Sequence, residues 1–226
     1  MPTVLITGAN RGIGLELGRQ YALNGWRVVA TCRNPINVGA LAKLTGQIDV
    51  YSLDVNDTTQ LLTLANELSN IPLDILINNA GIYGLKYRGP ENFDLMNWLK
   101  VIETNTIAPL NVAKAFVTNG CLSNGKIVTL TSKMGSIKDN TAGDSYVYRS
   151  SKAALNSVMK SLAIELTSSS IPVAVLHPGW VQTDMGGENA VISVKESVSG
   201  LRQVISELGM HNSGKFFNYD GTEIPW

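Results

Sequence analysis

The 226-residue chain contains few cysteines and histidines and has no excess of charge of either sign. Cys32 and Cys121 form no CxxC pair, so we expect two buried, reduced thiols and a cytoplasmic protein. His177 and His211 belong to no spaced ligand cluster, and we therefore expect no dedicated metal site. Lys and Arg together number 18, as do Asp and Glu, and no basic block stands out. This balance argues against nucleic acid and membrane surfaces as partners.

Long apolar runs are also missing. Residues Met1–Gly8 lack a charged segment followed by an apolar stretch, so no signal peptide is expected. No run reaches the roughly 20 apolar residues that a membrane-spanning helix needs. The chain shows no internal linker, tandem repeat or low-complexity segment, and 44% of its residues are hydrophobic against 16% charged. We therefore expect one globular domain over residues 1–226.

What the chain does contain is a regular alternation of short apolar runs and helical patterns. Strands are expected at Thr3–Ile6, Arg27–Cys32, Ile48–Leu53, Leu73–Ile77, Lys126–Thr131, Pro172–His177 and Lys215–Tyr219. Helices are expected after Gly14, after Asp57, over about Asp94–Asn119, from Tyr148 through Leu166 and over Val194–Leu208, with a loop at 82–93. This order predicts an α/β fold, a Rossmann-like doubly wound parallel sheet with helices on both faces.

The first strand runs into a glycine-rich turn, Thr7-Gly8-Ala9-Asn10-Arg11-Gly12-Ile13-Gly14, and a helix follows. Glycines allow a sharp turn and a close approach of a pyrophosphate, and the helix N-terminus offers free N–H groups. The spacing Gly-x3-Gly-x-Gly differs from the commoner Gly-x-Gly-x2-Gly, and it is not a Walker loop. A plain turn at a helix start explains the glycines equally well.

Cationic residues occur where a dinucleotide fold places the adenosine ribose. Arg33 follows the second strand directly, at a position where an acidic residue would bind the 2′-hydroxyl of NAD. Arg33, with Arg11 from the glycine turn, suits a 2′-phosphate instead and favours NADP(H). The alternative is a solvated loop arginine. The third strand ends at Asp54-Val55, beside the same expected cofactor site.

Two further stretches carry asparagines at structurally sensitive places. Asn78-Asn79-Ala80-Gly81 follows the fourth strand, where doubly wound sheets bind ligands. Asn105 falls in the middle of a long expected helix, and Pro109 should disturb that helix near it. The bend would free a backbone carbonyl, although a tolerated kink is the simpler interpretation.

The stretch Tyr148-Arg149-Ser150-Ser151-Lys152 spaces a phenol and an ammonium four residues apart. In a helix the two side chains share one face. A nearby cation favours phenolate, so we expect Lys152 to lower the pKa of Tyr148 and make it a usable proton donor. An amphipathic helix with a snorkelling lysine is the alternative.

Taken in order, these motifs resemble those of the short-chain dehydrogenase/reductase family. The resemblance covers essentially the whole chain and rests on Thr7-Gly8-x3-Gly12-Ile13-Gly14, Asn78-Asn79-Ala80-Gly81, Asn105, Ser132, Tyr148-x3-Lys152 and Pro178-Gly179. The stretch from His177 to Gly187 and the tail Phe217–Gly221 with Pro225-Trp226 resemble the C-factor and sniffer-type carbonyl reductase subgroup.

The resemblance implies roles for individual residues. Tyr148 would protonate the carbonyl oxygen, Lys152 would assist it and hold the nicotinamide ribose, and Ser132 would hydrogen-bond the carbonyl. Asn105 would hold a water that links Lys152 to solvent. The implied cofactor-binding residues are Gly8, Asn10, Arg11, Gly12, Ile13, Gly14, Arg33, Asp54, Val55, Asn79, Ala80, Gly81, Tyr148, Lys152, Pro178, Gly179, Val181 and Thr183.

The resemblance therefore implies an NADPH-dependent oxidoreductase that reduces an aldehyde, ketone or quinone to an alcohol. The alternative is a signalling or cofactor-sensing protein that binds NADP(H) with little turnover, and a structural module would leave the four motif residues unexplained. Family members commonly pair through the helices that carry Asn105 and Tyr148, so we expect a symmetric homodimer, with a tetramer as the alternative. Lys133, beside Ser132, is expected to face solvent and not substrate.

Overall fold

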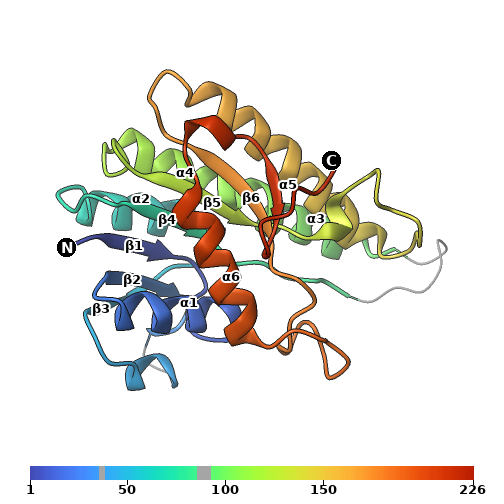
Figure 1. Ribbon diagram of the computed structural model, residues 1–226, viewed down its shortest axis with the longest axis horizontal. Helices are drawn as coiled ribbons and strands as arrows, with labels where there is room; N and C mark the ends of the chain where they lie inside the picture. The colour runs from blue at the N-terminus through green and yellow to red at the C-terminus, as the bar shows by residue number, and fades with distance from the viewer. Residues whose placement is uncertain (36–38, 86–92) are drawn as a thin grey trace.

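The computed structural model describes residues 1–35, 39–85 and 93–226, so part of the expected loop, 86–92, lies outside the described residues. Its centre is a parallel sheet in the order β3-β2-β1-β4-β5-β6-β7 (Figure 1). The strands are β1 (Thr3–Ile6), β2 (Arg27–Cys32), β3 (Ile48–Ser52), β4 (Ile75–Asn78), β5 (Lys126–Leu130), β6 (Val173–His177) and β7 (Phe216–Asn218). Every expected strand is present, with bounds that differ by no more than one or two residues.

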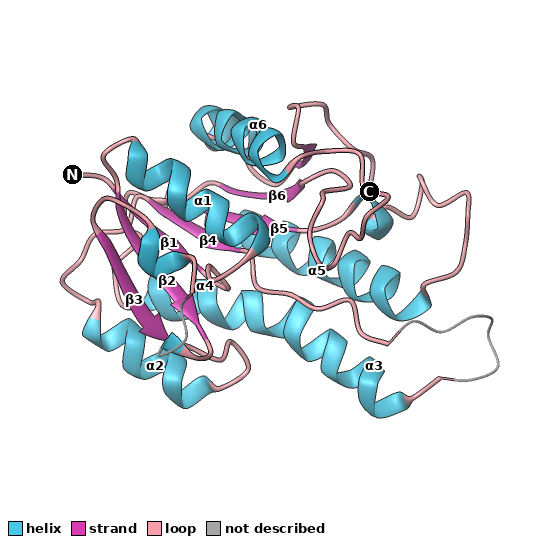
Figure 2. Cartoon of the chain, turned by 90° about the horizontal axis from the view of Figure 1, so that it is seen from below, coloured by secondary structure: helices cyan, strands magenta, loops and turns pink. Residues whose placement is uncertain are grey.

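Helices cover both faces of this sheet (Figure 2). One face carries α1 (Gly12–Leu23) and α6 (Val194–Glu207), and the other carries α2 (Thr58–Glu67), α4 (Ala108–Thr118) and α5 (Tyr146–Glu165). Alternate strand residues serve the two cores, so Leu5 packs on the α5 side and Val4 on the α1 side. Because both faces are buried, the strands have continuous apolar sequences, and the expected doubly wound fold is confirmed.

The long helix expected over 94–119 is interrupted. α3 (Leu95–Ile102) passes into a π-helical turn at Glu103–Ile107, and α4 begins directly after it. Pro109 lies in the first turn of α4, where a missing N–H costs little. The disturbance expected near Asn105 is thus present, and it takes the form of a widened turn that contains this buried residue.

The strand order reverses next to β1. The chain moves from β1 outward to β2 and β3, and then returns to place β4 on the other side of β1. A crevice opens at the carboxyl ends of strands at such a reversal. The backbone N–H of Thr7 donates to the carbonyl of Ile77 at 3.1 Å, which holds the glycine turn beside the end of β4. The fold therefore brings the separate sequence motifs to one edge of the sheet.

Candidate active site

The glycine turn after β1 is formed by backbone, and its glycines are sterically required. Gly8 and Gly12 have φ values of +66° and +53°, which disfavour other residues. A Cβ at Gly14 would lie 2.4 Å from the Gly8 carbonyl oxygen and 2.5 Å from Nδ2 of Asn79. The turn thus leaves no room for a side chain at Gly14, where the backbone of the turn packs directly on itself and on Asn79.

The end of β4 is fastened to this turn by a small set of polar bonds. The Thr7 hydroxyl accepts from the N–H groups of Asn79 and Ala80 at 3.0 and 3.1 Å. Asn79 Nδ2 in turn donates to the carbonyls of Thr7 and Gly8 at 2.8 and 3.0 Å. These bonds explain why the Asn79-Ala80-Gly81 motif follows this strand and how it supports the turn.

The residues present fit a dinucleotide phosphate at the start of α1. The N-cap residue Arg11 makes no side-chain capping bond, and no acidic residue occupies the first turn of the helix. An open helix N-terminus of this kind attracts an anion. Arg11 pairs with Asp184 at 2.8 Å, and Thr183 lies near Gly12, where a Cβ would approach its Cγ2 to 3.4 Å. Thr183, one of the implied cofactor-binding residues, and Asp184 therefore lie beside the glycine turn.

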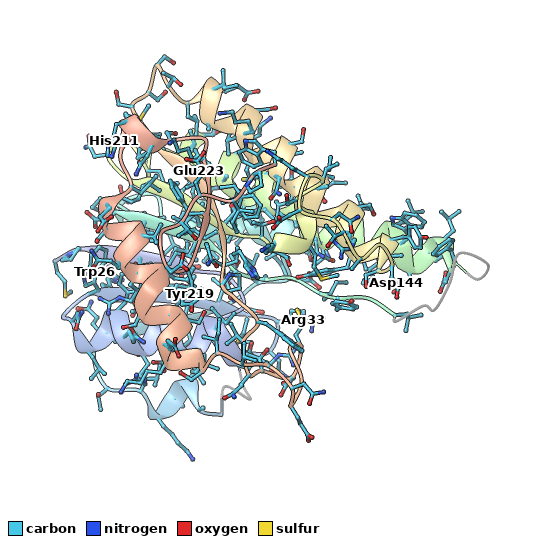
Figure 3. The ribbon with its side chains drawn as sticks, turned by 45° about the vertical axis from the view of Figure 1, so that its right-hand side comes forward. Trp26, Arg33, Asp144, His211, Tyr219 and Glu223 are labelled. Atoms are coloured by element: carbon cyan, nitrogen blue, oxygen red, sulfur yellow. The ribbon has the colours of Figure 1, made fainter. Side chains whose placement is uncertain are left out.

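Arg33 is exposed directly after β2, on the carboxyl side of the sheet (Figure 3). Its backbone carbonyl accepts from the Ser52 hydroxyl at 3.4 Å, next to the end of β3. Asp54 follows β3 and accepts from the N–H of Asn56 at 3.0 Å. The structure therefore places Arg33 and Asp54 at the ends of adjacent strands, with the Arg33 side chain accessible to an anion.

Three of the four residues expected to be catalytic come together from α5 and the segment after β5. Tyr148 and Lys152 lie on α5, while Ser132 follows β5, and a hydrogen bond links the hydroxyls of Ser132 and Tyr148. Lys152 is buried, with its Nζ 5.9 Å from the centroid of the Tyr148 ring and 3.0 Å from the carbonyl oxygen of Leu130, to which it donates. The spacing of Tyr148 and Lys152 predicted that their side chains share one helix face. The structure shows in addition that Ser132 lies within hydrogen-bonding distance of Tyr148.

The protonation of the pair differs from the expectation. Burial raises the pKa of Tyr148 to about 12, although the hydrogen bond with Ser132 acts in the opposite direction. Burial also lowers the pKa of Lys152 to about 8. The expectation that Lys152 lowers the pKa of Tyr148 is therefore wrong for the protein alone, because desolvation penalises both charges. At neutral pH the site holds a phenol that carries its proton.

Asn105 reaches the site from the π-helical turn. Its Oδ1 accepts from the N–H of Ile82 at 2.9 Å, and its Nδ2 donates to the Ile82 carbonyl at 2.8 Å and to Ser151 Oγ at 3.1 Å. A Cβ at Gly81 would lie 3.2 Å from Oδ1 of Asn105 and 3.8 Å from Nζ of Lys152. Asn105 is thus adjacent to the lysine, and its amide fastens the segment after β4 to α5.

Tyr83 packs on Tyr148, a contact that the sequence did not reveal. The two rings stack at 4.6 Å with an interplanar angle of 23°. The Tyr83 hydroxyl lies 2.9 Å from Oγ of Ser145, the residue directly before α5. Ser145 and its neighbour Asp144, which is labelled in Figure 3, have positive φ values of +51° and +56°. No sequence signal joins residues so far apart. Tyr83 therefore shields the phenol and holds the strained start of its helix.

Asn156 is a second site residue that sequence reasoning missed. It is buried on α5, one turn beyond Lys152, accepts from the Thr131 hydroxyl at 2.7 Å and donates to the Gly135 carbonyl at 3.4 Å. Both partners flank Ser132 in sequence, so Asn156 ties the serine segment to the helix. A polar residue continuing the i, i+4 series of Tyr148 and Lys152 was the available signal.

A cavity of about 570 Å³ opens above these groups. Its lining includes Ile13, Tyr83, Thr131, Ser132, Lys133, Met134, Asp139, Tyr148, Arg149, His177, Pro178, Gly179, Trp180, Val181, Thr183, Met185 and Gly186. Lys133 forms a salt bridge with Asp139 at 2.9 Å, and its side chain is 60% exposed. Lys133 therefore faces both the cavity and solvent. Volume and lining suit a small organic molecule.

Across residues 1–35, 39–85 and 93–226, no group of three or more His, Cys, Asp or Glu residues is placed to hold a metal ion. Among the helices that the structure describes, none has the length and apolarity needed to cross a bilayer.

Known proteins resemble this chain in sequence and in fold. A family model described as short chain dehydrogenase matches residues 2–191. The C-signal of Myxococcus xanthus is 42% identical over 158 residues, which are 69% of this chain and 93% of that protein. Carbonyl reductase Sniffer of D. melanogaster is 35% identical and covers 100% of both chains with a TM-score of 0.92. The NADPH-bound carbonyl reductase from chicken fatty liver is also 35% identical, with a TM-score of 0.89 over 100% of this chain and 99% of that one.

Proposed function

Because this chain belongs to the short chain dehydrogenase family, we propose that it is an NADPH-dependent carbonyl reductase that forms alcohols from aldehydes, ketones or quinones. The observation that carries this proposal is the partly buried Tyr148 phenol, which lines the cavity, is bonded to Ser132 and lies one helical turn from Lys152. Burial raises the pKa of Tyr148 to about 12, so the phenol carries the proton that reduction requires, and the Lys152 ammonium one turn away is the group that would stabilise the phenolate once that proton is given.

The proposed chemistry assigns each residue one task. When bound, the cofactor supplies a hydride to the carbonyl carbon. Tyr148 gives its proton to the carbonyl oxygen, and Ser132 hydrogen-bonds that oxygen as negative charge develops on it. Lys152 stabilises the phenolate left on Tyr148, and we propose that a water near Asn105 returns the proton.

The cofactor-binding residues are proposed from the same geometry. The backbone turn Gly8–Gly14 and the open N-terminus of α1 would hold the pyrophosphate. The exposed Arg33 and Arg11 would hold the 2′-phosphate, and Asp54 and Val55 would lie beside the adenosine. Asn79, Ala80 and Gly81 with Pro178, Gly179, Val181 and Thr183 would enclose the nicotinamide half.

Tyr148→Phe tests the proposal, because it removes one hydroxyl and keeps the ring that stacks on Tyr83. Turnover of a carbonyl substrate should fall by about 10²–10⁴-fold, the usual contribution of a positioned general acid. The affinity for NADPH should change little, because the glycine turn, Arg33 and Lys152 remain. Steady-state NADPH oxidation and a fluorescence titration of the same variant measure the two quantities. Wild-type turnover in Tyr148→Phe would reject the assignment.

A signalling or cofactor-sensing role is the second candidate, and the similarity to C-signal supports it. Binding alone does not need Ser132, Tyr148 and Lys152 together, so their juxtaposition favours chemistry. A sensor would show slow wild-type turnover that Tyr148→Phe hardly alters. The same pair of measurements therefore separates the two functions.

We also propose that residues 1–226 form a single domain that assembles as a symmetric homodimer, with a tetramer as the alternative. α3 presents the exposed apolar side chains Leu95, Met96 and Leu99, with exposed fractions of 66%, 73% and 53%. An apolar helix surface of this kind is typical of an interface between copies. Sedimentation of the wild type beside Met96→Glu tests the dimer. A wild-type monomer at micromolar concentration would contradict it.

The cysteines support the cytoplasmic location that we propose. Cys32 and Cys121 are free and buried, and burial raises the pKa of both thiols. Thiols in this state are typical of a reducing compartment.

A further inference from the structure

A cation directly follows each of the two hydroxyl residues of the site. Lys133 comes after Ser132 and Arg149 comes after Tyr148. Both cations line the cavity that contains the two hydroxyls, and Asp139 is the single carboxylate among its described lining residues. The cavity thus has an excess of positive charge in a chain whose formal net charge is zero.

Arg149 is held in place without being neutralised. Its Nε donates to the carbonyl of Gly143 at 2.9 Å, and its Nη1 donates to the carbonyl of Met134 at 3.3 Å. Carbonyl oxygens orient a guanidinium but leave its charge in place, and within the described part of the chain Arg149 forms no salt bridge. A guanidinium has five N–H groups, so donors remain for a ligand.

Lys133 can exchange its present partner for a ligand. Its Nζ lies 2.9 Å from Oδ2 of Asp139, and its side chain is 60% exposed. An exposed ion pair is weak because water screens it. A substrate anion that enters the cavity therefore competes with Asp139 for the lysine. His177 lines the same cavity, and burial lowers its pKa to about 4, so it adds no charge at neutral pH.

The rest of the cavity is mainly apolar. Met134, Trp180, Val181 and Met185 line it, and Trp180 and Met185 are 51% and 46% exposed at its mouth. We propose that the carbonyl substrate combines an apolar body with a carboxylate or similar acidic group, and that Lys133 and Arg149 bind this group. The proposal rests on the reductase function proposed above, and it narrows the substrate class from any carbonyl to anionic carbonyls.

A matched pair of aldehydes tests the inference. 4-Formylbenzoate and its methyl ester share ring and aldehyde, but only the acid is charged. With NADPH, the wild type should show a kcat/KM about tenfold higher for the acid, mainly through KM, which is the effect of one charge-assisted hydrogen bond. The ester withdraws electrons more strongly, so intrinsic reactivity opposes this preference. Added salt should reduce the preference.

Four variants, one of them a control, test whether the preference for the acid depends on the two cations. Lys133→Gln should raise KM for the acid about tenfold and leave the ester within about twofold. Asp139→Asn frees Lys133 and should lower KM for the acid. Lys138→Gln removes an exposed lysine from the same loop, outside the cavity lining, and should leave KM for both substrates unchanged.

Arg149→Gln should raise KM for the acid as Lys133→Gln does. If its loop is disturbed, Lys133→Gln decides alone, because the lysine side chain pairs only with Asp139 among the described residues.

The outcomes separate this inference from the function on which it rests. Reduction of the ester with equal or higher efficiency than the acid would overturn the anionic substrate class and leave the reductase function intact. An NADPH affinity weakened by Lys133→Gln, with the preference for the acid retained, would assign the lysine to the cofactor and overturn the inference. Failure of both aldehydes and of neutral ketones and quinones to oxidise NADPH would overturn both proposals.

Discussion

The glycine turn after β1 and the start of α5 lie at the same edge of the sheet but are built differently. The turn is backbone: Gly8 and Gly12 adopt positive φ, and the helix that follows has no side-chain cap. The N-terminal half of α5 depends on buried side chains, among them Lys152 and Asn156, which bond to the last residue of β5, Leu130, and to Thr131 directly after it. The glycine turn leaves backbone N–H groups free to bind a ligand, whereas the polar side chains of α5 form hydrogen bonds within the protein.

This difference determines how each region should respond to change. A backbone site fails when any side chain is added, because steric overlap is local and severe. A side-chain site fails when one partner is removed, because a buried polar group then loses its hydrogen bond. The first kind of failure should affect cofactor affinity, and the second should affect turnover and pH dependence.

The largest effect on cofactor binding is expected for Gly14→Ala, because the new Cβ would lie 2.4 Å from the Gly8 carbonyl oxygen. The turn must open, and NADPH affinity should fall by about 100-fold or more, the equivalent of roughly 3 kcal/mol. Gly18→Ala is the matched control in the same helix, where a Cβ meets nothing closer than 3.8 Å. It should keep NADPH affinity and stabilise by up to about 1 kcal/mol. Equal NADPH affinities for the two variants would contradict the steric account.

The pH dependence of stability should come from His177, which lines the cavity beside Ser132 and Tyr148. Burial lowers the pKa of His177 from 6.5 to about 4, so between these values the unfolded chain binds more protons. Stability should therefore fall by about 3 kcal/mol as pH drops through this window. Urea unfolding at several pH values measures it. His177→Gln should flatten the dependence, while His211→Gln, at an exposed residue (Figure 3), should not. Equal pH dependence in wild type and His177→Gln would contradict this account.

Asn156→Ala should impair turnover without affecting cofactor binding. It leaves the buried Thr131 hydroxyl without its 2.7 Å acceptor and releases the segment that carries Ser132. We expect a loss of about 1–3 kcal/mol in stability and roughly a tenfold lower kcat with unchanged NADPH affinity. Asn156→Asp keeps the acceptor and should restore most of kcat. Asn119→Ala, which breaks an exposed 3.1 Å bond, is the control. A lower NADPH affinity with normal kcat would refute the positioning role.

The smallest of these effects is expected for the exposed Arg33. Arg33→Ala should weaken NADPH binding about tenfold and leave NADH binding nearly unchanged, because only NADPH carries the 2′-phosphate. Arg11→Ala should act in the same direction but less, because Arg11 already pairs with Asp184. Fluorescence titration with both cofactors measures the ratio. Equal affinity of the wild type for NADPH and NADH would exclude this cofactor assignment.

Sequence patterns predicted most of the fold because its elements are locally encoded. β1 and β2 have their expected bounds, since each is a short apolar run closed by glycine or a cation. β4 begins at Ile75, two residues later than expected. Asp74 lies just before the strand, and its carboxylate accepts a hydrogen bond from the N–H of Thr3 at 2.7 Å. The break at Glu103–Ile107 was expected from Pro109, but its π-helical form was not.

The sequence by itself determined the fold class, the glycine turn and the shared helix face of Tyr148 and Lys152, because these depend on periodicity and backbone freedom within a few residues. Only the tertiary structure decided that Tyr83 stacks on Tyr148 and that burial raises the pKa of this phenol. It also placed Arg149 and Lys133 around one cavity. Such contacts and the resulting desolvation join distant parts of the chain, and no local spacing encodes them.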